Sequence, residues 1–147
     1  MQDIHEPTGL IAVGGYSSDV EVVPDSVITD PTTAYQKPII FLIDRMNQFR
    51  WRLCLRDFSE NVMSLKFSSD GTFIVAVMEN NPLTLIFIKT ADGLLLGSQR
   101  HSLPGGYTQD PRPCVGDCLA FSPNSNSFYL SLQSIYLATM EATYSPY

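Results

Sequence analysis

The chain has 147 residues and a formal charge of −6, with 44% hydrophobic and 16% charged residues. This length suits one domain, and the hydrophobic content is too high for a disordered chain. The acidic balance excludes nucleic-acid binding driven by net charge, and no apolar run approaches the roughly 20 residues of a membrane span. Three cysteines are too few for a disulfide scaffold. Residues Met1–Pro7 lack the pattern of a signal peptide, which favours a cytoplasmic or other intracellular location.

Short apolar runs, rich in β-branched and aromatic residues and separated by turn-forming residues, predict β-strands along most of the chain. No window keeps a helical period for three turns, so we expect a single all-β unit over residues 1–147. Two long polar connections, Ser17–Lys37 and Ser102–Gly116, interrupt the pattern. The predicted strands are Leu10–Gly14, Pro38–Asp44, Phe49–Leu55, Val62–Phe67, Phe73–Met78, Leu83–Lys89, Leu94–Ser98, Cys118–Phe121, Phe128–Leu132 and Ile135–Met140.

The strands are of two kinds. Phe73–Val77 and Leu85–Ile88 are apolar on both faces, which is typical of strands that are covered on both sides. The segment Phe49–Arg56 alternates instead, as a half-exposed outer strand does. In this segment we expect one face to carry Phe49, Trp51, Leu53 and Leu55, and the other to carry Arg50, Arg52, Cys54 and Arg56.

A weak internal repeat relates Ser64–Val75 to Cys118–Leu130: each has an apolar strand, a Phe-Ser pair, a turn and a buried strand. Gly71 offers a positive φ in the first turn, and Asn124 and Asn126 tolerate one in the second, which we align with one extra residue. A second internal similarity aligns Phe41–Asp44 and Asn47 with Phe87–Thr90 and Gly93, since each segment is a buried strand followed by a tight turn. The repeat predicts units of four antiparallel strands in meander order. Because they repeat at matching places, we expect seven residues to be buried in the core, namely Phe67, Phe73, Val75, Leu85, Phe87, Phe121 and Leu130.

The turn segments Phe67-Ser68-Ser69-Asp70-Gly71 and Phe121-Ser122-Pro123-Asn124 resemble the turn between the first two strands of a blade in β-propellers of the WD-repeat or quinoprotein-like kind. The resemblance covers residues 8–140. The copies lie 54 residues apart, more than the roughly 40–45 of WD repeats, because Ser102–Gly116 adds length. The Trp-Asp and Gly-His pairs of WD repeats are missing, and Ile43-Asp44 and Lys89-Thr90 stand in the Trp-Asp places.

This resemblance implies a partial β-propeller of four-stranded antiparallel blades, with a β-sandwich as the alternative. Residues 8–56 would hold the last three strands of one blade, 61–101 a full blade, and 117–140 the first three strands of another. Propellers close with about four to eight blades. The blades would therefore need other protein chains or missing propeller blades to cover them, which agrees with a charged fraction below the usual level of about 25%.

The residues that could carry chemistry form no complete site. Cys114 and Cys118 fit free thiols, a disulfide or a zinc site, but zinc needs a second pair, and only Cys54, His5 and His101 remain for it. The loop acids Asp19, Glu21, Asp25 and Asp30 lack calcium-site spacing, and no helix follows Gly14-Gly15 to bind phosphate. We therefore expect no cofactor, no metal and no catalytic residues.

Two groups of residues are candidates for contacts with a partner. The basic residues Arg45, Arg50, Arg52 and Arg56 could bind an acidic partner, although charges on an outer strand also prevent edge pairing. The segment Ser127–Met140 has no charged residue, so we expect partner contacts there, with Tyr129 and Leu137 as the test positions. The sequence thus favours a non-catalytic scaffold for protein–protein interaction in a larger assembly. The alternatives are a fragment of a propeller dehydrogenase or hydrolase with its active site elsewhere, and a ligand-binding propeller.

Overall fold

The computed structural model describes residues 2–17, 37–55, 58, 61–78, 83–101, 119–132 and 136–146. Over these residues the protein is all-β and contains no helix, as predicted. The ten predicted strands are all present, with small differences at their ends, and two further strands occur near the termini. The strands are β1 (Gln2–His5), β2 (Leu10–Ser17), β3 (Lys37–Ile43), β4 (Phe49–Cys54), β5 (Val62–Phe67), β6 (Phe73–Met78), β7 (Leu83–Lys89), β8 (Leu95–His101), β9 (Leu119–Phe121), β10 (Ser127–Leu132), β11 (Tyr136–Glu141) and β12 (Ser145–Pro146).

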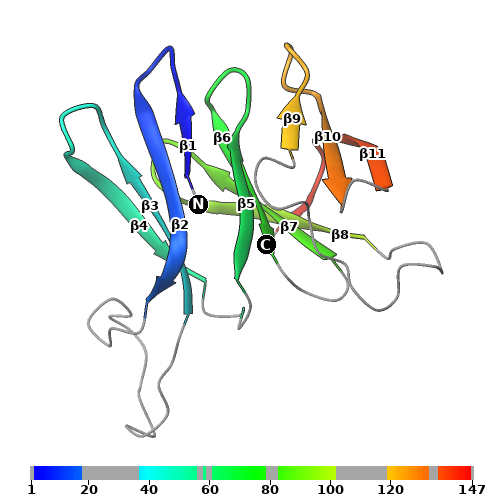
Figure 1. The fold of residues 1–147 in the computed structure, drawn as a ribbon, viewed down its shortest axis with the longest axis horizontal. Helices are drawn as coiled ribbons and strands as arrows, with labels where there is room; N and C mark the ends of the chain where they lie inside the picture. Colours follow the sequence, from blue (N-terminus) through cyan, green and yellow to red (C-terminus); the bar gives the residue numbers. More distant parts are fainter. Residues whose placement is uncertain are drawn as a thin grey trace, which may run out of the picture.

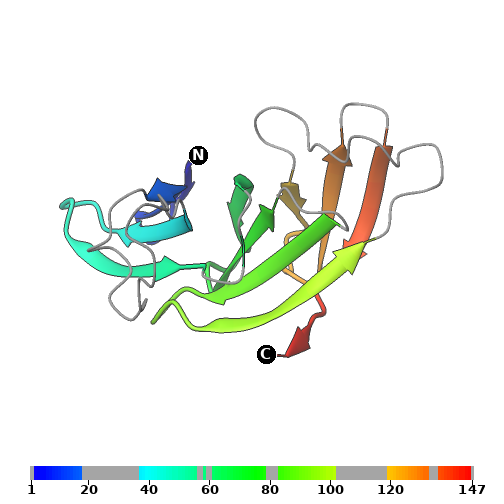
Figure 2. The same cartoon turned by 90° about the horizontal axis from the view of Figure 1, so that it is seen from below.

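The strands form three antiparallel sheets that lie side by side (Figure 1). The N-terminal sheet has the order β1-β2-β3-β4, the middle sheet β12-β8-β7-β6-β5, and the C-terminal sheet β11-β10-β9. Figure 2 shows the middle sheet between the other two. The first strands of successive sheets are neighbours, because β5 contacts both β1 and β9.

Two apolar cores separate the sheets. The first core lies between the N-terminal and middle sheets, and the second lies between the middle and C-terminal sheets. Neighbouring residues of β6 face opposite cores: Ile74 belongs to the first and Val75 to the second, and both are fully buried. In β7, Ile86 faces the first core and Phe87 faces the second. This confirms the prediction that β6 and β7 are covered on both faces.

The hydrophobic residues that repeat along the chain mostly lie in these cores. Phe73 and Phe121, which the repeat also places in the core, are only partly buried and pack against each other edge-to-face, with ring centroids 5.5 Å apart. Both lie beside a turn at the rim of the second core, where their outer edges meet solvent. The other five predicted core residues are buried, namely Phe67, Val75, Leu85, Phe87 and Leu130.

The N-terminal sheet has four strands, whereas the sequence predicted three between residues 8 and 56. The additional strand, β1, has only one aliphatic residue, Ile4, so its hydrophobic pattern is too short to identify. Its polar residues are used between sheets. Asp3 Oδ2 accepts a hydrogen bond of 2.8 Å from the Phe67 amide, and Asp3 Oδ1 lies 3.4 Å from Lys66 Nζ. Long-range contacts therefore place this strand.

The turns that follow the first strands connect the three sheets at one end of the molecule. His5 Nε2 lies 3.2 Å from the Ser69 carbonyl oxygen, which links the N-terminal and middle sheets. Ser69 Oγ donates to the Ser122 carbonyl at 2.6 Å, and the Asp70 amide donates to Ser125 Oγ at 3.0 Å. These bonds join the middle and C-terminal sheets.

The two copies of the repeated turn share the same hydrogen bonds. In each copy the serine amide donates to the carbonyl five residues later, and a side-chain oxygen two residues after the serine accepts from a nearby amide. The copies therefore correspond at a constant spacing, and the extra residue expected in the second turn is wrong. The positive φ falls on Gly71 (74°) and Ser125 (62°), not on the neighbouring asparagines. The matched positions are Ser68, Asp70, Thr72 and Phe73 in one copy and Ser122, Asn124, Asn126 and Ser127 in the other.

The second internal similarity, between the ends of β3 and β7 and the turns that follow them, is shifted by one residue from its predicted alignment. The Asp44 amide donates to the Gln48 carbonyl at 3.0 Å, and the Lys89 amide donates to the Leu94 carbonyl at 2.8 Å. Asp44 thus corresponds to Lys89, because the turn between β7 and β8 is one residue longer. By this alignment Ile43 corresponds to Ile88.

After β11 the chain leaves the C-terminal sheet and pairs with β8 as β12. The Tyr144 ring packs against Phe87 with centroids 4.9 Å apart, and Gln99 Nε2 donates to the Glu141 carbonyl at 2.7 Å. Gly97 permits this approach, because a Cβ at that position would overlap the Ser145 carbonyl. Over the described residues the C-terminal sheet therefore has three strands.

The carboxylate of Asp70 makes the first repeated turn sensitive to acid. Burial acts to raise the pKa of Asp70, but hydrogen bonds from Thr72 and Ser68 outweigh it and keep this pKa below its ordinary value of 3.8. A group with a lowered pKa stabilises the fold above its unfolded-state pKa, and this stabilisation is lost as the pH falls through the folded-state value.

We therefore expect Asp70→Asn to lose less stability than the unaltered chain when the pH is lowered from about 7 to about 3. The amide suits this turn, because Asn124 occupies the matching position in the second copy. Denaturant unfolding at the two pH values measures the difference. An identical pH dependence for both proteins would show that Asp70 does not contribute to it.

Candidate interaction surface

The outward face of the N-terminal sheet carries a row of apolar side chains that crosses all four strands. Ile4 lies opposite Ile11, Ile11 opposite Ile43, and Ile43 opposite Phe49. Ile4 is 46% exposed and Phe49 55% exposed, and the other two are partly buried. A second row of side chains lies beside this one on the same face, and we call the two rows together the N-terminal outward face. The second row consists of Gln2, Val13, Phe41 and Arg52.

The opposite face of the same sheet is closed by the middle sheet. There Ala12 and Leu42 are buried in the first core, in register with Trp51 on β4. The Trp51 ring is buried in this core, and its Nε1 donates to the Thr90 carbonyl at 2.7 Å, which connects β4 to the turn after β7.

The predicted alternation along β4 is wrong at its first residue. Phe49 was expected on the same face as Trp51, but Phe49 lies opposite Ile43 and Trp51 lies opposite Leu42. The register shifts between Leu42 and Ile43, where β4 has one extra residue between Phe49 and Trp51. A bulge of this kind puts these two side chains on opposite faces although they are two residues apart. Phe49 therefore joins the outward row, while Trp51 is 8% exposed.

The basic residues predicted to bind a partner have different surroundings. Arg45 lies over Gly9, and its Nη2 donates to the Glu6 carbonyl at 2.9 Å. Arg50 Nη2 lies 3.0 Å from Asp44 Oδ2. These two arginines stabilise turns of their own sheet.

The other two predicted basic residues differ from this pair. Arg52 is exposed on the N-terminal outward face. Arg56 lies outside the described residues. The N-terminal outward face therefore carries Arg52, one of the four arginines that were predicted to bind a partner.

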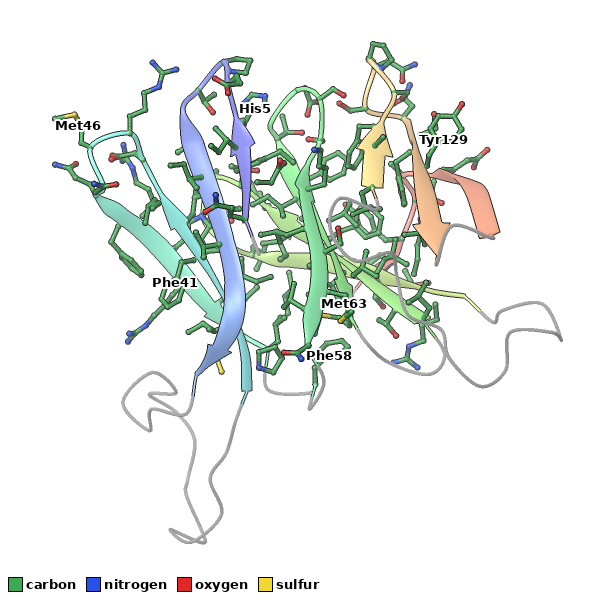
Figure 3. All side chains as sticks on the ribbon, viewed as in Figure 1. His5, Phe41, Met46, Phe58, Met63 and Tyr129 are labelled. Carbon is green, nitrogen blue, oxygen red and sulfur yellow. The ribbon has the colours of Figure 1, made fainter. Side chains whose placement is uncertain are left out.

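The C-terminal sheet has an outward face of its own, on the side opposite the second core. Phe128 and Leu130 are fully buried in that core, while Tyr129 between them is 48% exposed. Figure 3 shows Tyr129 and Phe41 at opposite ends of the row of sheets. Leu137 lies opposite Ser131 in the register of β11 and β10, but its side chain is outside the described part. We call the face that bears Tyr129 the C-terminal outward face.

The first strands of the three sheets enclose a shallow cavity of about 350 Å³, which sequence reasoning missed because β1 was not predicted. Its polar lining is already used within the fold. Asp3 binds the Phe67 amide and Lys66, and His5 Nδ1 lies 2.8 Å from Thr8 Oγ1. The cavity therefore adds no site to the outward faces.

Within the described ranges no three His, Cys, Asp or Glu side chains are grouped so that they could hold a metal ion. The candidate ligands Cys114 and Cys118, the side chain of His101 and the loop acids Asp19, Glu21, Asp25 and Asp30 lie outside those ranges. Among the described residues no helix is long and apolar enough to cross a membrane.

Comparison with protein-family models gave no match, and a search of curated proteins found no significant relative. Function is therefore inferred from the geometry of the sheets and of their two outward faces.

Proposed function

We propose that this chain is a non-catalytic scaffold of the β-propeller type, which binds other proteins within a larger assembly. The observation that carries the proposal is that the sheets differ in their number of consecutive strands. Among the described residues, the N-terminal and middle sheets each contain four consecutive strands in meander order, whereas the C-terminal sheet contains three. The adjacency of β1, β5 and β9 further supports an arrangement of blades around a common axis.

A scaffold needs a rigid frame that holds its contact surfaces in place. The two cores and the hydrogen bonds between turns supply this rigidity, because they bind the middle sheet to both neighbours. The contact surface is the C-terminal sheet. Its edge strand β11 pairs with β10 alone among the described residues, and no charge in Ser127–Met140 blocks a further strand.

Light scattering on the 147-residue chain tests this proposal. We expect a mass above that of one chain, because the edge strand of the C-terminal sheet and the exposed Tyr129 can bind another protein chain. A variant with Tyr129→Lys and Leu137→Lys should shift the mass toward one chain, since a charge is costly to bury in an apolar contact. A clean single chain that binds no hydrophobic dye would refute the proposal and favour a self-contained β-sandwich.

A further inference from the structure

The N-terminal outward face has the character of an interior face. Ile43 occupies the position that Ile88 occupies in the middle sheet, by the alignment of their turns. Ile88 is fully buried because the N-terminal sheet covers it, whereas Ile43 is only partly buried. The outward row of Ile4, Ile11, Ile43 and Phe49 thus has the composition of a surface that packs against a preceding sheet.

The C-terminal outward face shows the complementary relation. Tyr129 corresponds to Val75, because the two repeated turns align at a constant spacing. Val75 is fully buried under the following sheet, whereas Tyr129 is 48% exposed. The C-terminal face therefore corresponds to a surface that packs against a following sheet.

We propose that the two outward faces bind each other in a head-to-tail pair of chains, so that the C-terminal sheet of each copy packs on the N-terminal sheet of the other. This inference rests on the proposed scaffold function and identifies its partner as a second copy. Both contacts would repeat the sheet-on-sheet packing already present twice in the chain. The charges also agree, because exposed Arg52 lies on one face and exposed Glu141 on the other.

The number of sheets favours closure of such a pair. The described residues of each chain form three sheets, so two chains supply six, within the range of about four to eight blades at which propellers close. A head-to-tail contact joins two different surfaces and ends in a ring when the rotation closes. A closed pair would cover both outward faces of both chains.

Analytical ultracentrifugation with two face variants tests the pairing. The N-face variant carries Ile4→Glu and Phe49→Glu, and the C-face variant carries Tyr129→Lys; all three side chains are about half exposed, so the fold tolerates the changes. Leu94→Glu is the matched control, because Leu94 is 58% exposed and lies in the turn between β7 and β8 of the middle sheet, so it belongs to neither outward face. Circular dichroism verifies that each variant is folded.

We expect the unaltered chain and the Leu94→Glu control to sediment as two chains. Each face variant alone should sediment as one chain, with pairing weakened at least about tenfold. An equimolar mixture of the two variants should recover the two-chain species, because the intact C-terminal face of one meets the intact N-terminal face of the other. The altered faces in the mixture also carry opposite charges and attract each other.

Other outcomes overturn the inference in distinct ways. If the C-face variant alone still pairs, the contact joins two N-terminal faces and the head-to-tail arrangement is wrong. If the unaltered chain is single but binds hydrophobic dye, or forms irregular larger species, the scaffold proposal stands and the partner is not a second copy. A single chain that binds no dye refutes the scaffold proposal as well.

Discussion

Phe87→Ala should lower the free energy of unfolding by about 3–5 kcal/mol, the usual cost of removing a fully buried aromatic ring. Phe87 has no exposed surface. Its ring lies 5.9 Å from Phe73, 6.3 Å from Phe128 and 4.9 Å from Tyr144, measured between centroids. The substitution would therefore open a cavity where the middle sheet, the C-terminal sheet and the segment before β12 meet.

Urea denaturation measures this loss, with two comparison variants. Phe87→Leu keeps most of the apolar volume and should cost less than the alanine variant. Leu94→Ala removes an exposed side chain from the turn after the same strand and should change stability by about 0.5 kcal/mol or less. A loss under about 1 kcal/mol for Phe87→Ala would remove this residue from the core.

Gly71→Val should destabilise the protein by about 1–3 kcal/mol, for two reasons that add. Gly71 has a φ of 74°, which a β-branched residue adopts only under strain. A Cβ at this position would also lie 2.5 Å from Cε1 of the His5 ring. Because His5 reaches the Ser69 carbonyl, its displacement would weaken the contact between the N-terminal and middle sheets.

Gly15→Val is the matched control for this substitution, because no atom lies within 4 Å of a Cβ built there. It should leave the denaturation midpoint nearly unchanged, within about 0.5 kcal/mol. Thermal or urea unfolding of both variants gives the comparison. A neutral Gly71→Val would contradict the turn geometry and the alignment of the repeat that depends on it.

Local hydrophobic patterning was sufficient to locate most of the strands. Phe73–Val77 and Leu85–Ile88 are apolar at every position, and such runs need cover on both faces whatever the rest of the chain does. The turn residues between strands reinforced the pattern, as Asp70-Gly71 shows with its positive φ. These features depend on neighbouring residues, so they can be deduced without knowing the tertiary contacts.

The pattern failed where a strand depends on distant partners. β1 has few apolar residues and is placed by Asp3, which binds the Phe67 amide in the next sheet. β12 has only two residues, and it pairs with β8 where Gly97 leaves space for it. The bulge that turns Phe49 outward likewise arises in the pairing of β4 with β3.

Of the two candidate surfaces, one could be recognised in the sequence and the other could not. The absence of charge in Ser127–Met140 was visible in the sequence, and it directed attention to Tyr129. The N-terminal outward face was not visible, because Ile4 and Phe49 come from strands at opposite edges of the sheet. Composition and periodicity specify which residues are apolar and which strands they form. Long-range packing alone determines which apolar faces are covered, because each cover comes from a sheet that is distant in the sequence.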